Sequence, residues 1–249
     1  MIRYFDGLIQ GSDEWLAARC GLLTASEVKS IMSLPPKVET RVKKNGEPYK
    51  QREWNPVADN DDCRAHLFEL MSQRITGYVE PSYITDAMLR GQEDEIHARA
   101  LYAEKIAPVT EVGFITNDKW GFTLGYSPDG LVGDDGLIEC KSRRMKFQAE
   151  MIADLLPEDE IFPEFQLQAQ TGLLVSERSW LDHISYCGGM PMTVVRVHPD
   201  KVVQGAILEA AAAFEARLGA KLAKYHAALA NTALRTFPTE RKVEQEMYV

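Results

Sequence analysis

The chain has 249 residues, 45% of them hydrophobic and 26% charged, and its formal net charge is −9. This balance is typical of a globular protein with a sizeable core. No apolar run approaches the roughly 20 residues needed to cross a bilayer, and the chain starts without the basic and apolar segments of a secretory signal. These features exclude a membrane span, and we expect a cytoplasmic protein.

Six segments carry the signals of helices. Ser12 precedes two acids and an alanine-containing stretch, as a helix cap does, and the pair Thr24 and Glu27 resembles a capping box. The last segment is long, alanine-rich and amphipathic. The expected helices cover residues 12–20, 24–32, 61–76, 85–105, 163–176 and 199–230.

Six strands are also expected, four of them clustered in the middle of the chain. They are short and are separated by Gly or Asp turns. Because helices precede and follow this cluster, the order of elements predicts an α/β fold with a central mixed β-sheet flanked by helices. The expected strands cover residues 110–116, 121–126, 129–133, 136–141, 180–187 and 192–198.

No internal repeat or low-complexity linker divides the chain, so we expect a single domain over residues 1–249. The segment 34–60 is the most loop-like part, because prolines, asparagines and a glycine are interleaved there with basic residues. Residues 199–249 are expected to form a C-terminal helix and tail.

The cysteines and the charges bear on the class of function. Cys20, Cys63, Cys140 and Cys187 are far apart in sequence, which argues against a zinc ribbon and against a disulfide framework. A net charge of −9 is unusual for a protein that binds nucleic acid. A metal site would account for some of the acids, and basic residues gather after Lys141, although basic runs are usually solvated surface.

The most informative stretch contains two acids and a lysine. Asp129 begins one short strand, and Glu139 and Lys141 lie on the next. Two residues apart on a strand, Glu139 and Lys141 point to the same face. A turn at residues 133–136 returns the second strand to the side of Asp129, so the three side chains are expected to converge.

This grouping suits hydrolysis of a phosphodiester. Mg²⁺ prefers oxygen ligands and keeps several waters, so one or two carboxylates and a substrate phosphate suffice. One ion activates water, a second stabilises the leaving oxygen, and Lys141 orients the water. Metal and burial lower the pKa of Lys141 while carboxylates raise it, and the sequence leaves the balance open. The alternative is a turn Asp beside a surface Glu and Lys, since Pro-Asp-Gly is a common turn.

Four blocks within residues 10–175 bear on this choice. They are Gln10-Gly11-Ser12-Asp13-Glu14-Trp15 with Arg19-Cys20-Gly21 and Thr24-Ala25-Ser26-Glu27-Val28; Gly91-Gln92-Glu93-Asp94-Glu95 with Ala98-Arg99; Ser127-Pro128-Asp129-Gly130-Leu131 through Glu139-Cys140-Lys141; and Gln166-Leu167-Gln168-Ala169-Gln170. In this order they resemble the phage lambda exonuclease family, alkaline exonucleases of viral recombination with the restriction-endonuclease-like PD-(D/E)XK core. The blocks span about two thirds of the chain.

The resemblance implies a role for each matched residue of the catalytic centre. Asp129 and Glu139 are implied to bind metal together with the Cys140 carbonyl, and Lys141 is implied to be the catalytic lysine. Glu95 is implied to complete the site through metal or water. Two Mg²⁺ ions are expected, with Mn²⁺ as a substitute.

Other matched residues keep an alternative beside the implied role. Glu93 is the alternative to Glu95. Gln170 is implied to be the catalytic glutamine beside the active site, and Gln168 is its neighbour on the same segment and a candidate to contact the substrate. The alternative for both glutamines is a solvated polar surface.

The resemblance also implies a pocket for the 5′-phosphate of a DNA end. Arg19, Ser26 and Ser127 are its implied residues, because a guanidinium and hydroxyls are donors that suit phosphate oxygens. Arg19 alternatively faces the end of its own helix, and Ser26 alternatively caps a helix. Trp15 is expected to pack in the core, with stacking on a base as its alternative role.

The implied activity is degradation of one strand of linear double-stranded DNA from its 5′ end to 5′-mononucleotides, leaving a 3′ single strand. The resemblance also implies that the chain assembles as a homotrimeric ring and that its partner is a single-strand annealing protein. The implied location is the cytoplasm of a bacterial host, and the implied source is a phage or prophage. An endonuclease or junction resolvase and a non-catalytic module that binds DNA ends are alternatives. An iron–sulfur nuclease is disfavoured because the cysteines are scattered.

The chain departs from the family in three places. Ser142-Arg143-Arg144 stands where the family has a cysteine and a proline, and neither the segment 34–60 nor the C-terminal third matches a family block.

Overall fold

A computed structural model gives the fold, and it describes residues 1–33, 55–81, 83, 85–154, 161, 163–231 and 233–241. Most of the predicted loop-rich segment 34–60, namely residues 34–54, lies outside the described residues. Within the described ranges, no helix is both long enough and apolar enough to span a bilayer.

The strands form two four-stranded sheets instead of the one central sheet expected. The first sheet has the order β1-β3-β4-β2, in which only β4 and β2 run parallel. The second sheet has the order β5-β6-β7-β8, in which only β6 and β7 run parallel. Both sheets are therefore mixed, as predicted. Their strands are β1 (Ile2–Phe5), β2 (Leu23–Thr24), β3 (Phe114–Asn117), β4 (Leu124–Tyr126), β5 (Gly130–Val132), β6 (Gly136–Ser142), β7 (Trp180–Tyr186) and β8 (Thr193–Val197).

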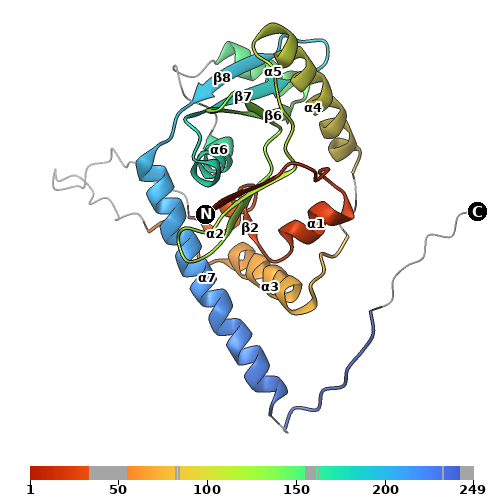
Figure 1. Cartoon of the computed structure of the whole chain (residues 1–249), viewed down its shortest axis with the longest axis vertical. Helices are drawn as coiled ribbons and strands as arrows, with labels where there is room; N and C mark the ends of the chain where they lie inside the picture. The colour runs from red at the N-terminus through yellow and green to blue at the C-terminus, as the bar shows by residue number, and fades with distance from the viewer. Residues whose placement is uncertain are drawn as a thin grey trace, which may run out of the picture.

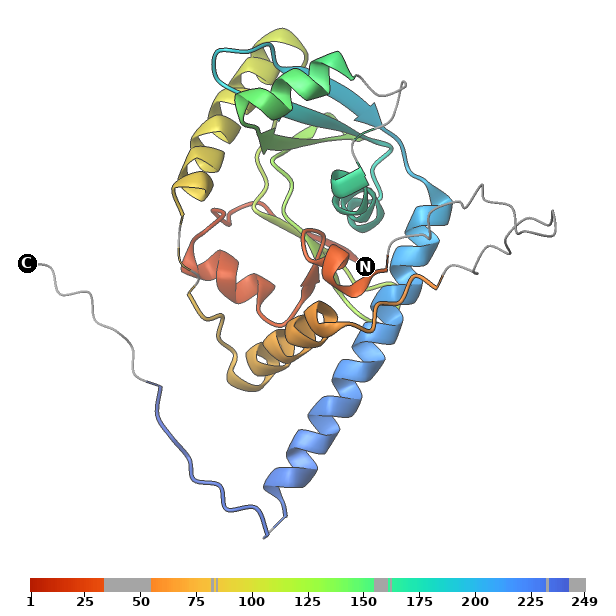
Figure 2. The same ribbon diagram turned by 180° about the vertical axis from the view of Figure 1, so that it is seen from behind.

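Helices flank both sheets (Figures 1 and 2). Helix α6 packs against β3 and β4 of the first sheet and β7 of the second, while α4 packs against β6 and β7. Helix α7 runs along one side of the molecule and contacts α2, α3 and α6. The helices are α1 (Asp13–Arg19), α2 (Val28–Ile31), α3 (Asp61–Thr76), α4 (Asp86–Lys105), α5 (Met145–Ala153), α6 (Pro163–Ser176) and α7 (Lys201–Leu229).

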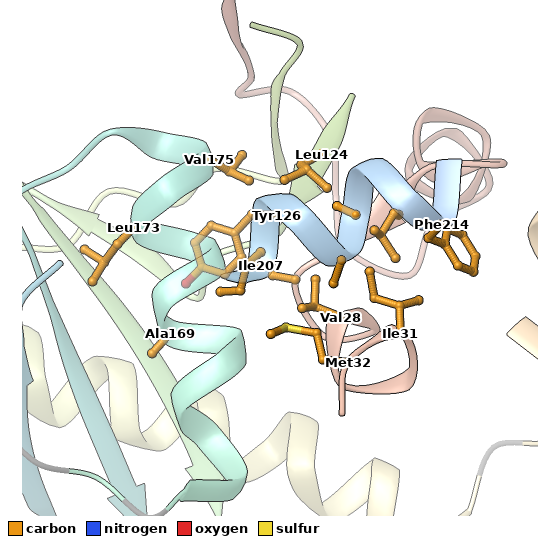
Figure 3. Packing of buried hydrophobic residues seen from close by; sticks show 14 of the residues in the cluster. Val28, Ile31, Met32, Leu124, Tyr126, Ala169, Leu173, Val175, Ile207 and Phe214 are labelled. Atoms are coloured by element: carbon orange, nitrogen blue, oxygen red, sulfur yellow. The ribbon is translucent and has the colours of Figure 1, made fainter. Parts of the chain in front are cut away.

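The main core lies where α2, α6 and α7 meet the first sheet (Figure 3). Its side chains come from segments far apart in sequence, and their burial supplies the main driving force for this packing. Residues shown in Figure 3 include Val28, Ile31, Met32, Leu124, Tyr126, Ala169, Leu173, Val175, Ile207 and Phe214. A smaller cluster with Tyr102, Ile138 and Ile184 joins α4 to the second sheet.

Three elements were not predicted, and five of the six expected strands are shorter than expected. Strands β1 and β2 have only four and two residues, which is too few for an alternating pattern. Helix α5 starts after Arg144, whose side chain makes no cap hydrogen bond, so no helix-start signal precedes it. The strand expected over 110–116 begins at Phe114, and Thr110 forms an isolated bridge with Leu131.

Candidate active site

The β5–β6 hairpin positions the two acids of the central motif. Gly133 has φ of +52° in the turn, a left-handed conformation that suits glycine. The register pairs Gly130 with Ile138, so Asp129 lies beside Glu139 in the middle of β6. There the Asp129 carboxylate accepts a hydrogen bond from the backbone N–H of Cys140. The predicted convergence of the acids is therefore present.

Glu139, Lys141 and Gln168 contact one another. The Lys141 Nζ donates to Glu139 Oε1 at 2.7 Å and to Gln168 Oε1 at 3.0 Å. The Gln168 amide nitrogen in turn donates to Glu139 Oε1. Glu139 is only 4% exposed, whereas the Lys141 side chain is 24% exposed. The lysine therefore stands between a buried acid and solvent, held by α6 as well as by its own strand.

Tyr126 fixes the other oxygen of Glu139, a contact that the sequence did not reveal. Its buried hydroxyl donates to Glu139 Oε2 at 2.8 Å. Gly172 lets α6 lie against the same ring, since a Cβ at this position would be 2.7 Å from a ring carbon of Tyr126. Glu139 is thus hydrogen-bonded at both oxygens.

Helix α4 contributes the third acid, and the geometry favours Glu95 over Glu93. Arg99 donates to Glu95 Oε1 at 2.9 Å and to the Asp129 backbone carbonyl at 3.2 Å. Glu93 is exposed. The sequence block that contains Arg99 does not by itself assign this residue a function. The spacing of four residues between Glu95 and Arg99 on a helix would have predicted their ion pair.

The electrostatics show an excess of acid at this point. Burial raises the pKa of Asp129 well above its ordinary value, and the nearby Glu139 and Glu95 raise it further. Burial also raises the pKa of Glu95, against the opposing effect of Arg99. Burial lowers the pKa of Lys141, but Glu139 and Asp129 outweigh it and the net shift is upward. The balance that the sequence left open therefore favours a charged lysine.

Gln170, which is predicted to be catalytic, has its amide partners outside this cluster. It is buried, its amide nitrogen donates to the His198 carbonyl at 2.8 Å, and its amide oxygen accepts from the Asp200 N–H at 2.8 Å. Residues two apart on a helix do not face the same way. Gln168 therefore points to the acids, while Gln170 ties α6 to the connection between β8 and α7.

Arg19 and Ser26 lie together at the first sheet. The Arg19 guanidinium donates to the Thr24 hydroxyl at 3.0 Å, and that hydroxyl is 3.3 Å from the Ser26 hydroxyl. Glu27 accepts from the Thr24 N–H and hydroxyl, at 3.0 and 2.6 Å. Glu27, not Ser26, is the N-cap of α2. Arg19 is also the last residue of α1, so its alternative role at the helix end coexists with this placement.

Trp15 connects Arg19 to Ser127. Its ring lies 4.2 Å from the Arg19 guanidinium carbon, and its indole N–H donates to the Ser127 hydroxyl at 3.0 Å and to the Gly113 carbonyl at 3.1 Å. Trp15 therefore links Arg19 to Ser127, while the Thr24 hydroxyl links Arg19 to Ser26. Burial lowers the pKa of Arg19, and Glu27 opposes this effect.

A family model, the YqaJ-like viral recombinase domain, matches residues 14–179, which contain the acids, Lys141 and Gln168. This chain belongs to the YqaJ-like viral recombinase family. No match was found among proteins of curated function.

Solved structures agree with membership of the YqaJ-like family. The alkaline exonuclease LHK-Exo from Laribacter hongkongensis is 32% identical, with a TM-score of 0.70 over 88% of this chain and 98% of that one. LHK-Exo in complex with dAMP matches over the same shares, at 33% identity and a TM-score of 0.70. A phage-related exonuclease from Haemophilus somnus 129PT, 13% identical with a TM-score of 0.53 over 82% and 96% of the two chains, shares the fold. The YqaJ-like chain is therefore a nuclease of the viral recombinase-type alkaline exonuclease family.

The acids of this YqaJ-like chain form a donor set that fits a divalent cation. Among the residues that the structure describes, no three His, Cys, Asp or Glu side chains are close enough together to enclose a metal ion by themselves. Mg²⁺ does not need a complete set of protein ligands, since one or two carboxylates and several waters suffice. The N–H of Cys140 points to Asp129, and on a strand the carbonyl of the same residue points to the same side. Asp129, Glu139 and the Cys140 carbonyl would thus hold the ion.

A cavity of about 840 Å³ opens beside this donor set. Glu95, Arg99 and Asp129 line it together with apolar side chains such as Ile9 and Ile96, and further polar and acidic residues complete the lining. Ile9 and Ile96 are 75% and 58% exposed, which is unusual for isoleucine. A space that combines apolar side chains with acids of the donor set suits a nucleotide, whose base is apolar on its faces and whose phosphate would meet the cation.

Proposed function

We propose that this chain is a metal-dependent exonuclease that degrades the 5′-ended strand of linear double-stranded DNA to 5′-mononucleotides and leaves a 3′ single-stranded overhang. The observation that carries the proposal is the contact of Lys141 with Glu139 and Gln168 beside the buried Asp129. Family membership supports the nuclease chemistry. The dAMP bound to LHK-Exo is a nucleoside monophosphate, the class of product that this activity releases.

The residues of the chain have distinct parts in the proposed reaction. Mg²⁺, or Mn²⁺ in its place, would supply Lewis-acid stabilisation of the phosphate and a more acidic water when bound, and we propose two ions. Asp129, Glu139 and Glu95 hold the positive charge at the scissile phosphate. The Lys141 ammonium orients the attacking water and offsets developing negative charge. Gln168 keeps that ammonium in place, so we assign it the role first predicted for Gln170.

Arg19, Ser26 and Ser127 provide the proposed 5′-phosphate pocket. Arg19 has donors left after its bond to Thr24, and the two serine hydroxyls are half-buried or exposed and available for phosphate oxygens. Trp15 is proposed to position the pocket, since its ring and N–H contact Arg19 and Ser127. A fixed 5′-phosphate would set the distance to the scissile bond and limit each step to one nucleotide.

The wider setting is also proposed and follows from the family resemblance. The chain would assemble as a homotrimeric ring around DNA, which would keep an acidic protein on an acidic polymer by topology. A single-strand annealing protein would coat the exposed 3′ strand. The setting would be the cytoplasm of a bacterial host, in phage-type recombination, and the chain would act as one domain.

Digestion of linear duplexes labelled at the 5′ or the 3′ end, with Mg²⁺, with Mn²⁺ and with EDTA, tests the proposal. We expect release of labelled mononucleotide from the 5′ label at the first step and no activity in EDTA. Early release from the 3′ label would contradict the polarity. Cleavage of covalently closed circles would favour the endonuclease or junction-resolvase alternative, and binding of DNA ends without any product would favour the non-catalytic module.

A further inference from the structure

A row of cations and aromatic rings continues from Lys141 toward α5. Gln168, which contacts Lys141, and Phe165 are three residues apart and share one face of α6. The Arg143 guanidinium lies over the Phe165 ring at 5.2 Å and over the Phe147 ring at 5.3 Å. Lys141 and Arg143 therefore both contact side chains of α6, and the Arg143 guanidinium lies over two aromatic rings.

The row ends in exposed side chains on the first turn of α5. Lys146 lies over the Phe147 ring at 4.6 Å, and Arg144, Lys146 and Phe147 are exposed. Arg143 is only 14% exposed and pairs with the exposed Glu164 at 3.0 Å. In the described ranges, no carboxylate pairs with Arg144 or Lys146. We call Arg143, Arg144, Lys146 and the Phe147 ring the α5 cation row.

Helix α5 is fixed to the second sheet, so the row keeps its place relative to Lys141. Gln148, which is fully buried, accepts from the Ser185 hydroxyl at 2.6 Å. Its amide nitrogen donates to the Ser185 and Pro191 carbonyls at 3.2 and 2.7 Å. The buried Met151 adds an apolar contact one turn later. The cations are therefore presented on a rigid support rather than on a free loop.

We propose that the α5 cation row binds phosphates of the degraded strand on the 3′ side of the scissile bond, an inference that rests on the proposed function. The 5′-phosphate pocket lies on α1 and the first sheet, whereas α5 lies beside the second sheet, on the side of β6 that is away from α1 (Figures 1 and 2). A strand that starts in the pocket and passes Lys141 then continues toward α5. On a chain of net charge −9, Arg144 and Lys146, which pair with no carboxylate in the described ranges, complement a polyanion.

Phosphate binding by the α5 cation row predicts a specific dependence of activity on salt concentration. Each phosphate contact releases counterions, so the logarithm of affinity falls with the logarithm of salt concentration with a slope of about −0.9 per contact. We therefore compare the parent chain with the double variant Arg144→Ala/Lys146→Ala, and measure kcat/KM on a linear duplex across a range of NaCl concentrations. Loss of two contacts should make the salt slope shallower by about 2. The matched control is Lys105→Ala/Lys201→Ala, which removes two exposed cations far from the row and should keep the parent slope.

Neutral methylphosphonate linkages locate the contact. Placed at the second and third linkages from the 5′ end of the degraded strand, they should lower kcat/KM of the parent chain and add little in the Arg144→Ala/Lys146→Ala variant. The same linkages in the complementary strand should act equally on both chains. An unchanged salt slope, or equal effects of the degraded-strand linkages on parent and variant, would overturn the proposal. The digestion of end-labelled duplexes tests the polarity of the parent chain in a separate experiment. A failure of the proposed function can therefore be distinguished from a failure of the α5 cation row.

Discussion

The candidate active site and the candidate 5′-phosphate pocket use different interactions. Around Glu139, charged groups touch directly, with Lys141 at 2.7 Å. Around Arg19 the contacts are a hydroxyl and an indole ring, and the nearest carboxylate, Glu27, is 3.8 Å away.

This difference matches two tasks. Burial raises the pKa of Asp129, repulsion from Glu139 and Glu95 raises it further, and a bound cation would oppose both effects. Within the described part of the chain, the Arg19 guanidinium of the pocket donates one hydrogen bond, to Thr24, so its other donors suit a dianionic phosphate. Substitutions in the first region should therefore affect the chemical step, and substitutions in the second should affect the choice of DNA end.

The largest effect is expected at Lys141. Lys141→Ala removes the ammonium group beside the reacting phosphate, and single-turnover cleavage should slow by about 10³-fold or more. Binding of DNA, measured by fluorescence anisotropy, should survive. Lys105→Ala, at an exposed lysine, is the control. Cleavage within tenfold of the parent would show that Lys141 has no catalytic part.

The next effect concerns the end preference. Arg19→Ala removes a charge-assisted donor worth about 1.5–3 kcal/mol, so the preference for a 5′-phosphate over a 5′-hydroxyl should fall about 10- to 100-fold. The measured quantity is the ratio of kcat/KM for the two ends. Lys29→Ala is a nearby control. If the unaltered chain digests both ends equally, the pocket assignment is wrong.

The two glutamines separate chemistry from stability. Gln168→Ala should lower kcat about tenfold or more, because Lys141 loses a positioning partner, with little change in Tm. Gln170→Ala leaves the His198 carbonyl and the Asp200 N–H without their partner and should destabilise the fold by about 1–3 kcal/mol. Thermal unfolding and single-turnover rates are measured on both variants, and the reverse pattern would restore the prediction for Gln170.

The smallest effect is on stability against pH. The folded-state pKa of Asp129 is raised, so the folded state binds more protons, and stability should fall as pH rises from about 4 through the folded pKa. In EDTA at pH 8, Asp129→Asn should therefore stabilise the chain by on the order of 1 kcal/mol. Mg²⁺ should stabilise the parent chain and not the variant. A lower Tm for the variant in EDTA would contradict the electrostatic interpretation.

Short-range sequence patterns predicted six of the seven helices in the described residues, and the hairpin that brings Asp129 to Glu139, because both depend on local spacing. They did not predict the division into two sheets, which depends on pairing between distant segments such as β1 and β3. The same limit explains the site. Lys141 and Glu139 follow from spacing along one strand, whereas the contact of Tyr126 with Glu139 and the choice of Gln168 over Gln170 depend on how deeply α6 packs.

That depth is set at Gly172, where α6 meets the Tyr126 ring with no room for a methyl group. Gln168 is one helical turn earlier on the same face, so any side chain at 172 would lift the helix and draw its amide away from the lysine. We therefore expect Gly172→Ala to slow cleavage, although this change alters no group with a proposed part in the chemistry.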